Sequence, residues 1–241
     1  MVRSTAEILV TVLSNNEHVV LTHSDFHPPF AVQFKGYKLA AWVLRKLGWQ
    51  LSFEGLPARQ GVFIMYPHTS NWDFVVLLLM KWATGIQPSF WAKDSLFNIP
   101  LLGSWLRYLG GVPVRRSSAH GMVGDAVAMF EQAKKEDSFF WVALAPEGTR
   151  KKVSGWRSGF YRTTCGAQVP LCLVKLDYRL KTIRVTDFIR LTGNEAQDFE
   201  RLAAVYDGVS GKNPHNASPI SLLGADVPRI ESVNLNRELK P

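Results

Sequence analysis

The sequence predicts a single α/β domain whose central sheet is mainly parallel and flanked by helices, with an N-terminal helical extension. A chain of 241 residues has room for one domain of this kind. Hydrophobic residues make up 46% of it and charged residues 20%, which excludes disordered, collagen-like and coiled-coil chains. From residue 50 onward, short apolar runs alternate with stretches of helical periodicity, an order typical of βαβ units.

The chain divides into three parts. Residues 1–34 form the N-terminal extension, with a predicted short helix and a loop that ends at Pro28 and Pro29. Residues 35–215 form the main domain, and residues 216–241 form a C-terminal tail.

The first predicted helix of the domain covers residues 37–49. Its Leu, Trp and Val residues recur every three or four positions, and Lys38, Arg45 and Lys46 flank them. Such a helix can pack its apolar stripe on the core or lie in a membrane interface. The sequence leaves both interpretations open.

Strands and helices alternate along the rest of the domain. Predicted strands cover residues 61–66, 112–114, 139–144, 169–174 and 182–186. Predicted helices cover residues 72–82, 120–135 and 198–206. Because sites in parallel sheets form where the strands end, the loops after these strands are the place to look for function.

The charge balance predicts an anionic partner. The net charge is +8, and residues 61–190 hold 17 basic and 9 acidic side chains, so the excess does not belong to a basic tail. Such a chain can bind nucleic acid, an acidic lipid surface or a phosphorylated small molecule. The total does not choose among the three, although a nucleic-acid partner is not expected because no reader motif accompanies the charge.

Cysteine usage and hydropathy point to the cytoplasm. Cys165 and Cys172 lack metal-ligand spacing and are interpreted as reduced thiols. The N-terminal apolar run is shorter than a signal-peptide core. The longest apolar stretch, residues 74–92, is interrupted by Lys81, Gly85 and Pro88, so we expect peripheral attachment at most.

The first candidate site follows the predicted strand 61–66. Pro67 ends the strand, and a tight turn can bring Asp73 back to His68. If Asp73 accepts a hydrogen bond from one ring nitrogen, the other nitrogen is free to take a proton from an alcohol. The spacing alone is a weak signal, because His120 and Asp125 share it without following a strand.

Two further segments carry donors for phosphate oxygens. After strand 139–144 come Glu147, Gly148, Thr149 and Arg150, which offer backbone N–H groups, a hydroxyl and a guanidinium. The Gly111 turn leads into a short strand and then Arg115 and Arg116. Each segment taken alone is also compatible with an ordinary solvated turn.

Together and in this order, the segments resemble the motifs of the glycerophosphate and lysophospholipid acyltransferase family. The resemblance covers roughly residues 35–215, and its blocks lie at residues 67–73, 111–116, 146–150 and 169–174. The third block, Pro-Glu-Gly-Thr-Arg, is intact and is the most specific.

Three positions depart from the family pattern. Pro67 replaces the usual Asn, Arg115 stands where an acidic or amide residue is common, and Leu173 replaces the second Pro of the fourth block. None of them removes a catalytic group. They bear on the substrate, because the second and fourth blocks help to shape the acceptor and acyl sites in this family.

The resemblance implies a reaction and a role for each matching residue. His68 would be the general base and Asp73 would orient it. Backbone amides near Gly111 would stabilise the oxyanion, and the acceptor's phosphate and glycerol part would be held by Arg116, Glu147, Gly148, Thr149 and Arg150. Lys93 and Arg157 are further basic candidates.

The resemblance also implies the partners. The enzyme would move a fatty acyl group to a lysophospholipid such as 1-acyl-glycerol-3-phosphate at an anionic membrane surface, on its cytoplasmic face. It would need no cofactor or metal, since acyl-CoA or acyl carrier protein is a co-substrate. A thioesterase using the same dyad, and a non-catalytic membrane-binding module, remain as alternatives.

Overall fold

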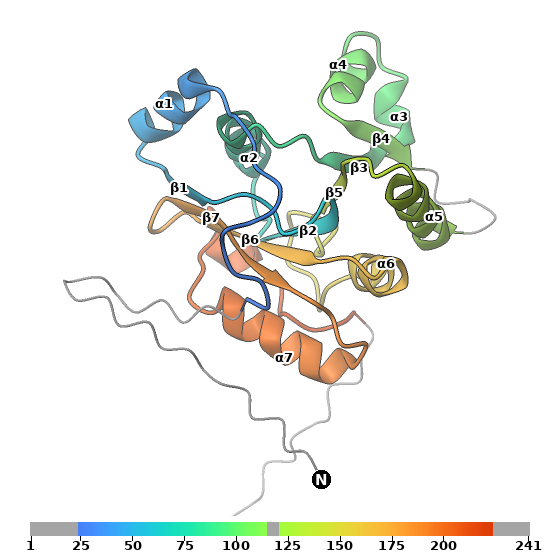
Figure 1. Ribbon diagram of the computed structural model, residues 1–241. Helices are drawn as coiled ribbons and strands as arrows, with labels where there is room; N and C mark the ends of the chain where they lie inside the picture. The colour runs from blue at the N-terminus through green and yellow to red at the C-terminus, as the bar shows by residue number, and fades with distance from the viewer. Residues whose placement is uncertain (1–23, 115–120, 224–241) are drawn as a thin grey trace, which may run out of the picture.

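The computed structural model describes residues 24–114 and 121–223 (Figure 1). The helix predicted in the N-terminal extension falls on residues 1–23 and lies outside this part. The helices are α1 Lys38–Lys46, α2 Trp72–Thr84, α3 Asp94–Phe97, α4 Leu102–Tyr108, α5 Gly121–Lys135, α6 Gly159–Ala167, α7 Glu195–Tyr206 and the 3₁₀ turn η1 Pro214–Asn216. The strands are β1 Gln50–Phe53, β2 Gln60–Tyr66, β3 Ser89–Lys93, β4 Gly111–Val114, β5 Phe140–Leu144, β6 Leu171–Asp177 and β7 Thr182–Ile189.

The strands form one sheet in the order β1-β7-β6-β2-β5-β3-β4. Neighbouring strands are parallel except β6 and β7, which form an antiparallel pair. Because β1 is parallel to β7, these two strands run opposite to the other five. The prediction of a mainly parallel sheet flanked by helices is confirmed.

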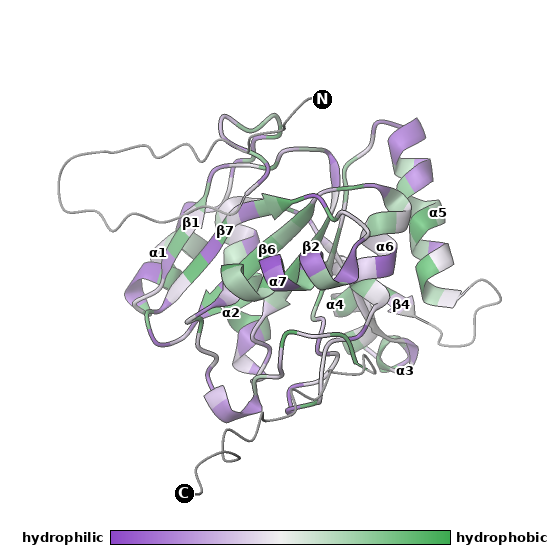
Figure 2. Ribbon diagram, turned by 90° about the horizontal axis from the view of Figure 1, so that it is seen from below, coloured by the Kyte–Doolittle hydropathy of each residue, from purple (hydrophilic) through white to green (hydrophobic). Residues whose placement is uncertain are grey.

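The sheet is covered on both faces, and strand periodicity supplies both cores. In β2, Val62 and Ile64 enter one core while Phe63 between them enters the other. The first core packs against α5, α6 and α7, and the second against α1 and α2. Figure 1 shows α2 and α7 on opposite sides of the sheet, and Figure 2 shows the central strands in the hydrophobic colour. Burial on both faces is what makes these strands continuous apolar runs in the sequence.

Besides the 3₁₀ turn η1, five elements were not predicted: β1, β3, α3, α4 and α6. The strand β1 has only four residues and lies at the edge of the sheet. The helix α6 contains Gly159, Thr163, Thr164 and Gly166, which favour helices weakly. It forms because Phe160 and Tyr161 are buried against Phe199 of α7. Tertiary packing decides such short elements, whereas local propensity decides little.

The C-terminal tail was predicted to begin at residue 216, but residues 216–223 pack on the domain. Trp156 forms a parallel bridge with Leu222, and the Ser218 hydroxyl accepts from the Val153 amide at 3.1 Å. Ala217, Ile220 and Leu222 of this segment also pack against the core. The boundary of the folded part therefore lies at residue 223 or beyond.

No helix within residues 24–114 and 121–223 combines the length and hydropathy needed to span a bilayer.

Candidate active site

The candidate site lies at the carboxyl edge of the parallel strands. The turns after β2, β5 and β6 meet there, because Ile64 pairs with Leu144 and Tyr66 pairs with Lys175. The sheet thus brings together segments that are far apart in the sequence. This is the edge at which parallel sheets carry their ligands.

His68 and Asp73 are in contact, as the spacing predicted. Nδ1 of His68 lies 3.1 Å from Oδ2 of Asp73. The same oxygen accepts from the amides of Thr69 at 2.8 Å and Ser70 at 2.9 Å. Asp73 is completely buried, whereas the His68 side chain is 14% exposed. The arrangement fixes one ring nitrogen on the carboxylate and leaves Nε2 as the nitrogen free for a substrate.

The local sequence explains this turn. Asp73 lies in the first turn of α2, where a carboxylate is stabilised by the helix dipole and by free amides. Ser70 also forms a hydrogen bond with the first residue of α2, since its hydroxyl accepts from the Trp72 amide at 3.2 Å. Burial alone would raise the pKa of Asp73, but hydrogen bonds from His68 and the Ser70 amide, together with the neighbouring Tyr178 hydroxyl, lower it. Asp73 is therefore held in its charged form.

Glu147 supports the turn instead of facing a substrate. Its Oε2 accepts from the His68 amide at 2.6 Å and its Oε1 from the Ser218 amide at 2.9 Å. Its side chain is only 1% exposed, and burial raises its pKa despite the hydrogen bonds. The expected contact between Glu147 and the acceptor does not fit this geometry. A buried carboxyl with two amide donors positions the backbone that carries His68.

Two pockets meet at His68. The first has a volume of about 470 Å³ and is lined by Gly148, Thr149, Arg150 and Arg157 among others. Among the described residues, no Asp or Glu lines it. Its two guanidiniums and a hydroxyl suit an anionic, oxygen-rich group.

Gly148 lets the second guanidinium approach. Its φ of +65° is in the left-handed region, and a Cβ there would lie 2.6 Å from Nε of Arg157. Arg157 is fixed at its backbone as well, since its amide donates to the Pro146 carbonyl at 2.8 Å. Glycine is thus required for the arginine to lie against the 146–150 turn. The candidate Arg157 belongs to the site, together with Thr149 and Arg150.

The second pocket is apolar. It has a volume of about 270 Å³, and its walls include Phe74 and Leu77 of α2, Phe90 of β3, and Leu109. Lys81 also lines it, but the ammonium donates to the Leu109 carbonyl at 2.5 Å, and burial lowers the pKa of this lysine. His68 and Arg150 line both pockets. His68 therefore lies between a cationic pocket and an apolar one.

The remaining candidates lie elsewhere. Gly111 does not line either pocket of His68; a Cβ on it would meet the Leu106 carbonyl at 2.8 Å, so its glycine is explained by packing. Lys93 ends β3. Arg116 lies outside the described residues, as do Arg115 and His120. Within the described ranges no group of three His, Cys, Asp or Glu side chains is placed to hold a metal ion.

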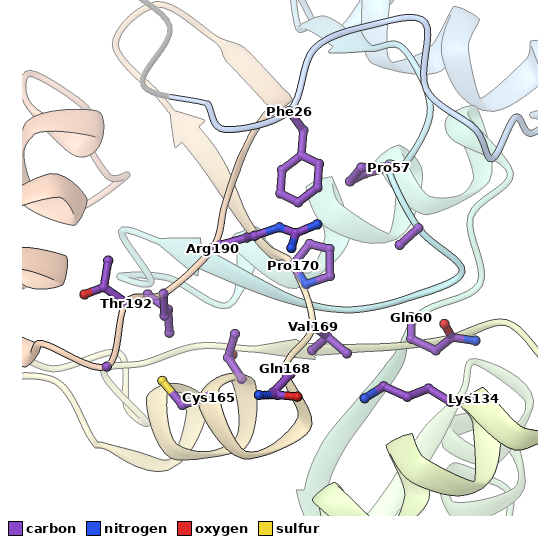
Figure 3. A pocket seen from close by; sticks show the side chains of 14 residues that line it. Phe26, Pro57, Gln60, Lys134, Cys165, Gln168, Val169, Pro170, Arg190 and Thr192 are labelled. Atoms are coloured by element: carbon purple, nitrogen blue, oxygen red, sulfur yellow. The ribbon is translucent and has the colours of Figure 1, made fainter. Parts of the chain in front are cut away.

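A larger pocket than either of these lies at the opposite, amino edge of the sheet. It has a volume of about 700 Å³ and is lined by Phe26, Lys134, Cys165 and Arg190 among others (Figure 3). Its cations are engaged: Lys134 donates to the Ala167 carbonyl at 2.6 Å, and Arg190 lies 5.1 Å from the Phe26 ring centre. No histidine of the described ranges lines it. Size alone does not make this pocket the reactive one.

Comparison with known proteins places the chain in a family. The family model described as Acyltransferase matches residues 50–174. The chain belongs to the acyltransferase family. The matched residues include the His68 turn and the turn of Glu147 and Arg150, so the predicted enzyme class is confirmed.

Two other comparisons complete the picture. A search of curated protein sequences finds no significant match for this acyltransferase. Among solved structures, it is similar to the crystal structure of the 1-acyl-sn-glycerophosphate (LPA) acyltransferase PlsC from Thermotoga maritima, with a TM-score of 0.48 and 19% identity. The alignment covers 70% of this chain and 74% of that one.

Sequence reasoning missed the residues that support the site from outside the motifs. Asn213 donates from its side chain to the Thr69 carbonyl at 2.9 Å, and its amide donates to the Thr69 hydroxyl at 3.2 Å. Ser218 holds Glu147, and its carbonyl accepts from the Tyr66 hydroxyl at 2.9 Å. No local pattern announces such contacts, because each joins segments more than 70 residues apart.

Proposed function

We propose that this acyltransferase moves a fatty acyl group from a thioester donor, acyl-CoA or acyl carrier protein, to a hydroxyl of a lysophospholipid-type acceptor such as 1-acyl-glycerol-3-phosphate. One observation carries the proposal. A His68/Asp73 pair stands where a pocket with two arginines meets an apolar pocket. Those are the three parts needed to handle a hydroxyl, a phosphate and an acyl chain.

The proposed chemistry needs no covalent intermediate on the protein. His68 Nε2 takes the proton of the acceptor hydroxyl, and the oxygen attacks the thioester carbonyl carbon. The tetrahedral intermediate collapses with cleavage of the C–S bond, and the thiolate receives the proton from the imidazolium. Asp73 stabilises the imidazolium through Nδ1, at the 3.1 Å contact. The products are the ester and the free thiol.

The cationic pocket suits the phosphate of the acceptor. Arg150 and Arg157 supply guanidinium donors, which match phosphate oxygens in geometry and charge. The Thr149 hydroxyl lies in the same pocket and adds a donor. Because Arg150 also lines the apolar pocket, the phosphate would lie within reach of the base. We assign Gly148 the task of leaving room for Arg157.

The apolar pocket suits an acyl chain. Its aliphatic and aromatic walls reach His68 at one place, so an ester or thioester carbonyl at the mouth would place the chain inside. The amine of Lys81 is turned to a backbone carbonyl and leaves the wall apolar. Which of the two substrates places its chain there is decided by chain-length assays with each varied in turn.

Exposed apolar side chains support attachment to a membrane. Leu39 of α1 is 72% exposed, Tyr108 of α4 82% and Leu101 beside α4 87%. The groove between these helices and α2 has a volume of about 650 Å³, and the three helices lie on the same side of the sheet in Figure 1. The basic residues in the last turn of α1, Arg45 and Lys46, would meet anionic headgroups. With both thiols free, we place this surface on the cytoplasmic leaflet.

The decisive experiment follows acyl transfer by mass spectrometry. Purified protein is given a panel of lysophospholipids with acyl-CoA or acyl carrier protein, in the presence of anionic vesicles. His68→Ala is expected to lower kcat by about 10²–10⁴-fold, the usual contribution of a general base. His120→Ala is the matched control, since it shares the five-residue spacing to an Asp, and should keep normal turnover.

Three results would overturn the proposal. A thiol released at the same rate without any acceptor would indicate a thioesterase. Normal turnover of purified His68→Ala would show that His68 is not the general base. Vesicle binding by a folded protein that transfers no acyl group to any acceptor would favour a membrane-binding module.

A further inference from the structure

Asp73 uses one of its two carboxylate oxygens in the contacts with the His68 turn. Oδ2 accepts all three of those hydrogen bonds, from His68, Thr69 and Ser70. Oδ1 is buried, and among residues 24–114 and 121–223 it has no partner at full hydrogen-bond geometry. A buried charged oxygen without a donor is costly, so a donor is expected close to it.

Tyr178 carries that donor. Its hydroxyl is likewise buried and, in the described part of the chain, without a partner at full geometry. The two groups nevertheless influence each other. Burial first, and then the neighbouring Asp73 carboxylate, raise the pKa of Tyr178. Tyr178 is in turn among the neighbours that lower the pKa of Asp73.

The fold places Tyr178 beside the dyad. It directly follows β6, the neighbour of β2 in the sheet, so it lies at the same edge as the turn after β2. Its ring packs edge-on against Trp49 with centroids 4.9 Å apart. Its amide donates to the Ser210 carbonyl at 2.8 Å. The turn that carries Tyr178 is fixed as well, because Oδ1 of Asp177 accepts from the amides of Arg179 and Leu180.

The segment that holds Tyr178 also touches the His68 turn. Gly211 lies so close to Thr69 that a Cβ on it would be 2.6 Å from the threonine hydroxyl. Asn213 then binds both the carbonyl and the hydroxyl of Thr69. Tyr178, the 210–213 segment and the 67–73 turn are therefore one packed unit.

We propose that Tyr178 is a positioning residue of the dyad: its hydroxyl donates to Oδ1 of Asp73 and holds the carboxylate with Oδ2 toward His68. The proposal rests on the proposed function, since it assigns Tyr178 to the same reaction. Without this donor, the carboxylate could rotate and bring its other oxygen toward His68. With it, each carboxylate oxygen of Asp73 has a donor. The orientation of Asp73 toward His68 is then held by contacts from the turn after β2 and from the residue that follows β6.

The test is Tyr178→Phe, which keeps the ring against Trp49 and removes only the hydroxyl. We expect kcat to fall about 10-fold or more, the usual effect of losing a hydrogen bond that orients a reactive group, while the KM of the acceptor stays unchanged. The acid limb of the kcat/KM profile should move to higher pH, because Asp73 loses a hydrogen bond that lowers its pKa. The groups to consider in that profile are His68, Tyr178 and Glu147, which binds the His68 amide.

Tyr161→Phe is the matched control. The Tyr161 hydroxyl donates to the buried Asp198 at 2.8 Å, the same pair of groups placed between α6 and α7. Its removal should leave both kcat per folded molecule and the pH profile at the wild-type values. Equal changes in the two variants would mean that Tyr178 is merely structural.

The outcomes separate this inference from the function on which it rests. If His68→Ala loses transfer but Tyr178→Phe keeps the wild-type kcat and acid limb, the positioning role is wrong and the function stands. If His68→Ala keeps transfer, the function fails first. A lower kcat with a shifted acid limb in Tyr178→Phe alone supports the role.

Discussion

The two edges of the sheet carry pockets of opposite character. The amino-edge pocket is the larger, at about 700 Å³, yet Lys134 is bound to a carbonyl and Arg190 lies over an aromatic ring. The carboxyl-edge pocket has about 470 Å³ and combines Arg150 and Arg157 with a histidine on a buried carboxylate. A reactive site is thus recognised by side chains that stay available and oriented, and its volume is a poor guide.

The largest expected effect concerns the charge behind His68. Asp73→Asn keeps an oxygen that can accept from the turn amides but removes the negative charge that supports the imidazolium. We expect kcat to fall by about 10³-fold, since a general base and its orienting group act as one unit. Initial rates with lysophosphatidic acid and acyl-CoA measure it. Asp125→Asn in α5, which has the same spacing from a histidine, should keep a kcat near wild type. An equal fall in kcat there would contradict a specific role of Asp73.

The next effect compares an arginine from each edge. Arg150→Ala should raise the KM of a phosphate-bearing acceptor about 10- to 100-fold with a small change in kcat, because a charge-assisted hydrogen bond to phosphate is lost. Arg190→Ala, at the amino edge, should change neither value more than about twofold. Saturation curves for the acceptor decide it. If Arg190→Ala raised KM as much as Arg150→Ala, the acceptor would bind at the wrong edge for this function.

The smallest effect is one of stability and pH. Glu147→Gln leaves an amide nitrogen facing a backbone N–H, which costs about 1–3 kcal/mol and lowers Tm by roughly 2–10 °C. Because burial raises the pKa of Glu147 above 4.5, its contribution to stability is present below that pH and is lost as the pH rises through the raised value. The Tm gap between wild type and variant should therefore narrow as the pH rises from about 4.5. Glu131→Gln, an exposed acid on α5, should show neither the loss nor the trend.

The sequence predicted the parts of this protein that depend on local patterns. The strands around Ile64 and Leu144 were predicted because burial on both faces makes them apolar runs. The turn from His68 to Asp73 was predicted because a helix start, a proline and a short spacing constrain it locally. The predicted contact of Asp73 with His68 rests on five residues of chain.

The unpredicted parts depend on long-range contacts. Glu147 was expected to face the acceptor, but Ser218 and the His68 amide take both its oxygens. Gly111 was expected near the reacting centre, but packing against Leu106 accounts for it. In both cases the motif predicts the residue type correctly. Which group that residue contacts is decided by segments far away in the sequence, and only the folded structure shows it.

The contacts of Ser218 and Asn213 extend the folded acyltransferase domain beyond its motifs on the C-terminal side. The stretch recognised by the family model stops at residue 174, yet Glu147 is held by Ser218 and Thr69 by Asn213, some 40 residues later. A fragment cut to residues 50–174 would keep every motif. It would lose the hydrogen bonds that hold the Thr69 turn and Glu147. A tag or a fusion partner should therefore be attached after residue 223, and surveys that trim sequences to the matched stretch discard part of what holds the histidine in place.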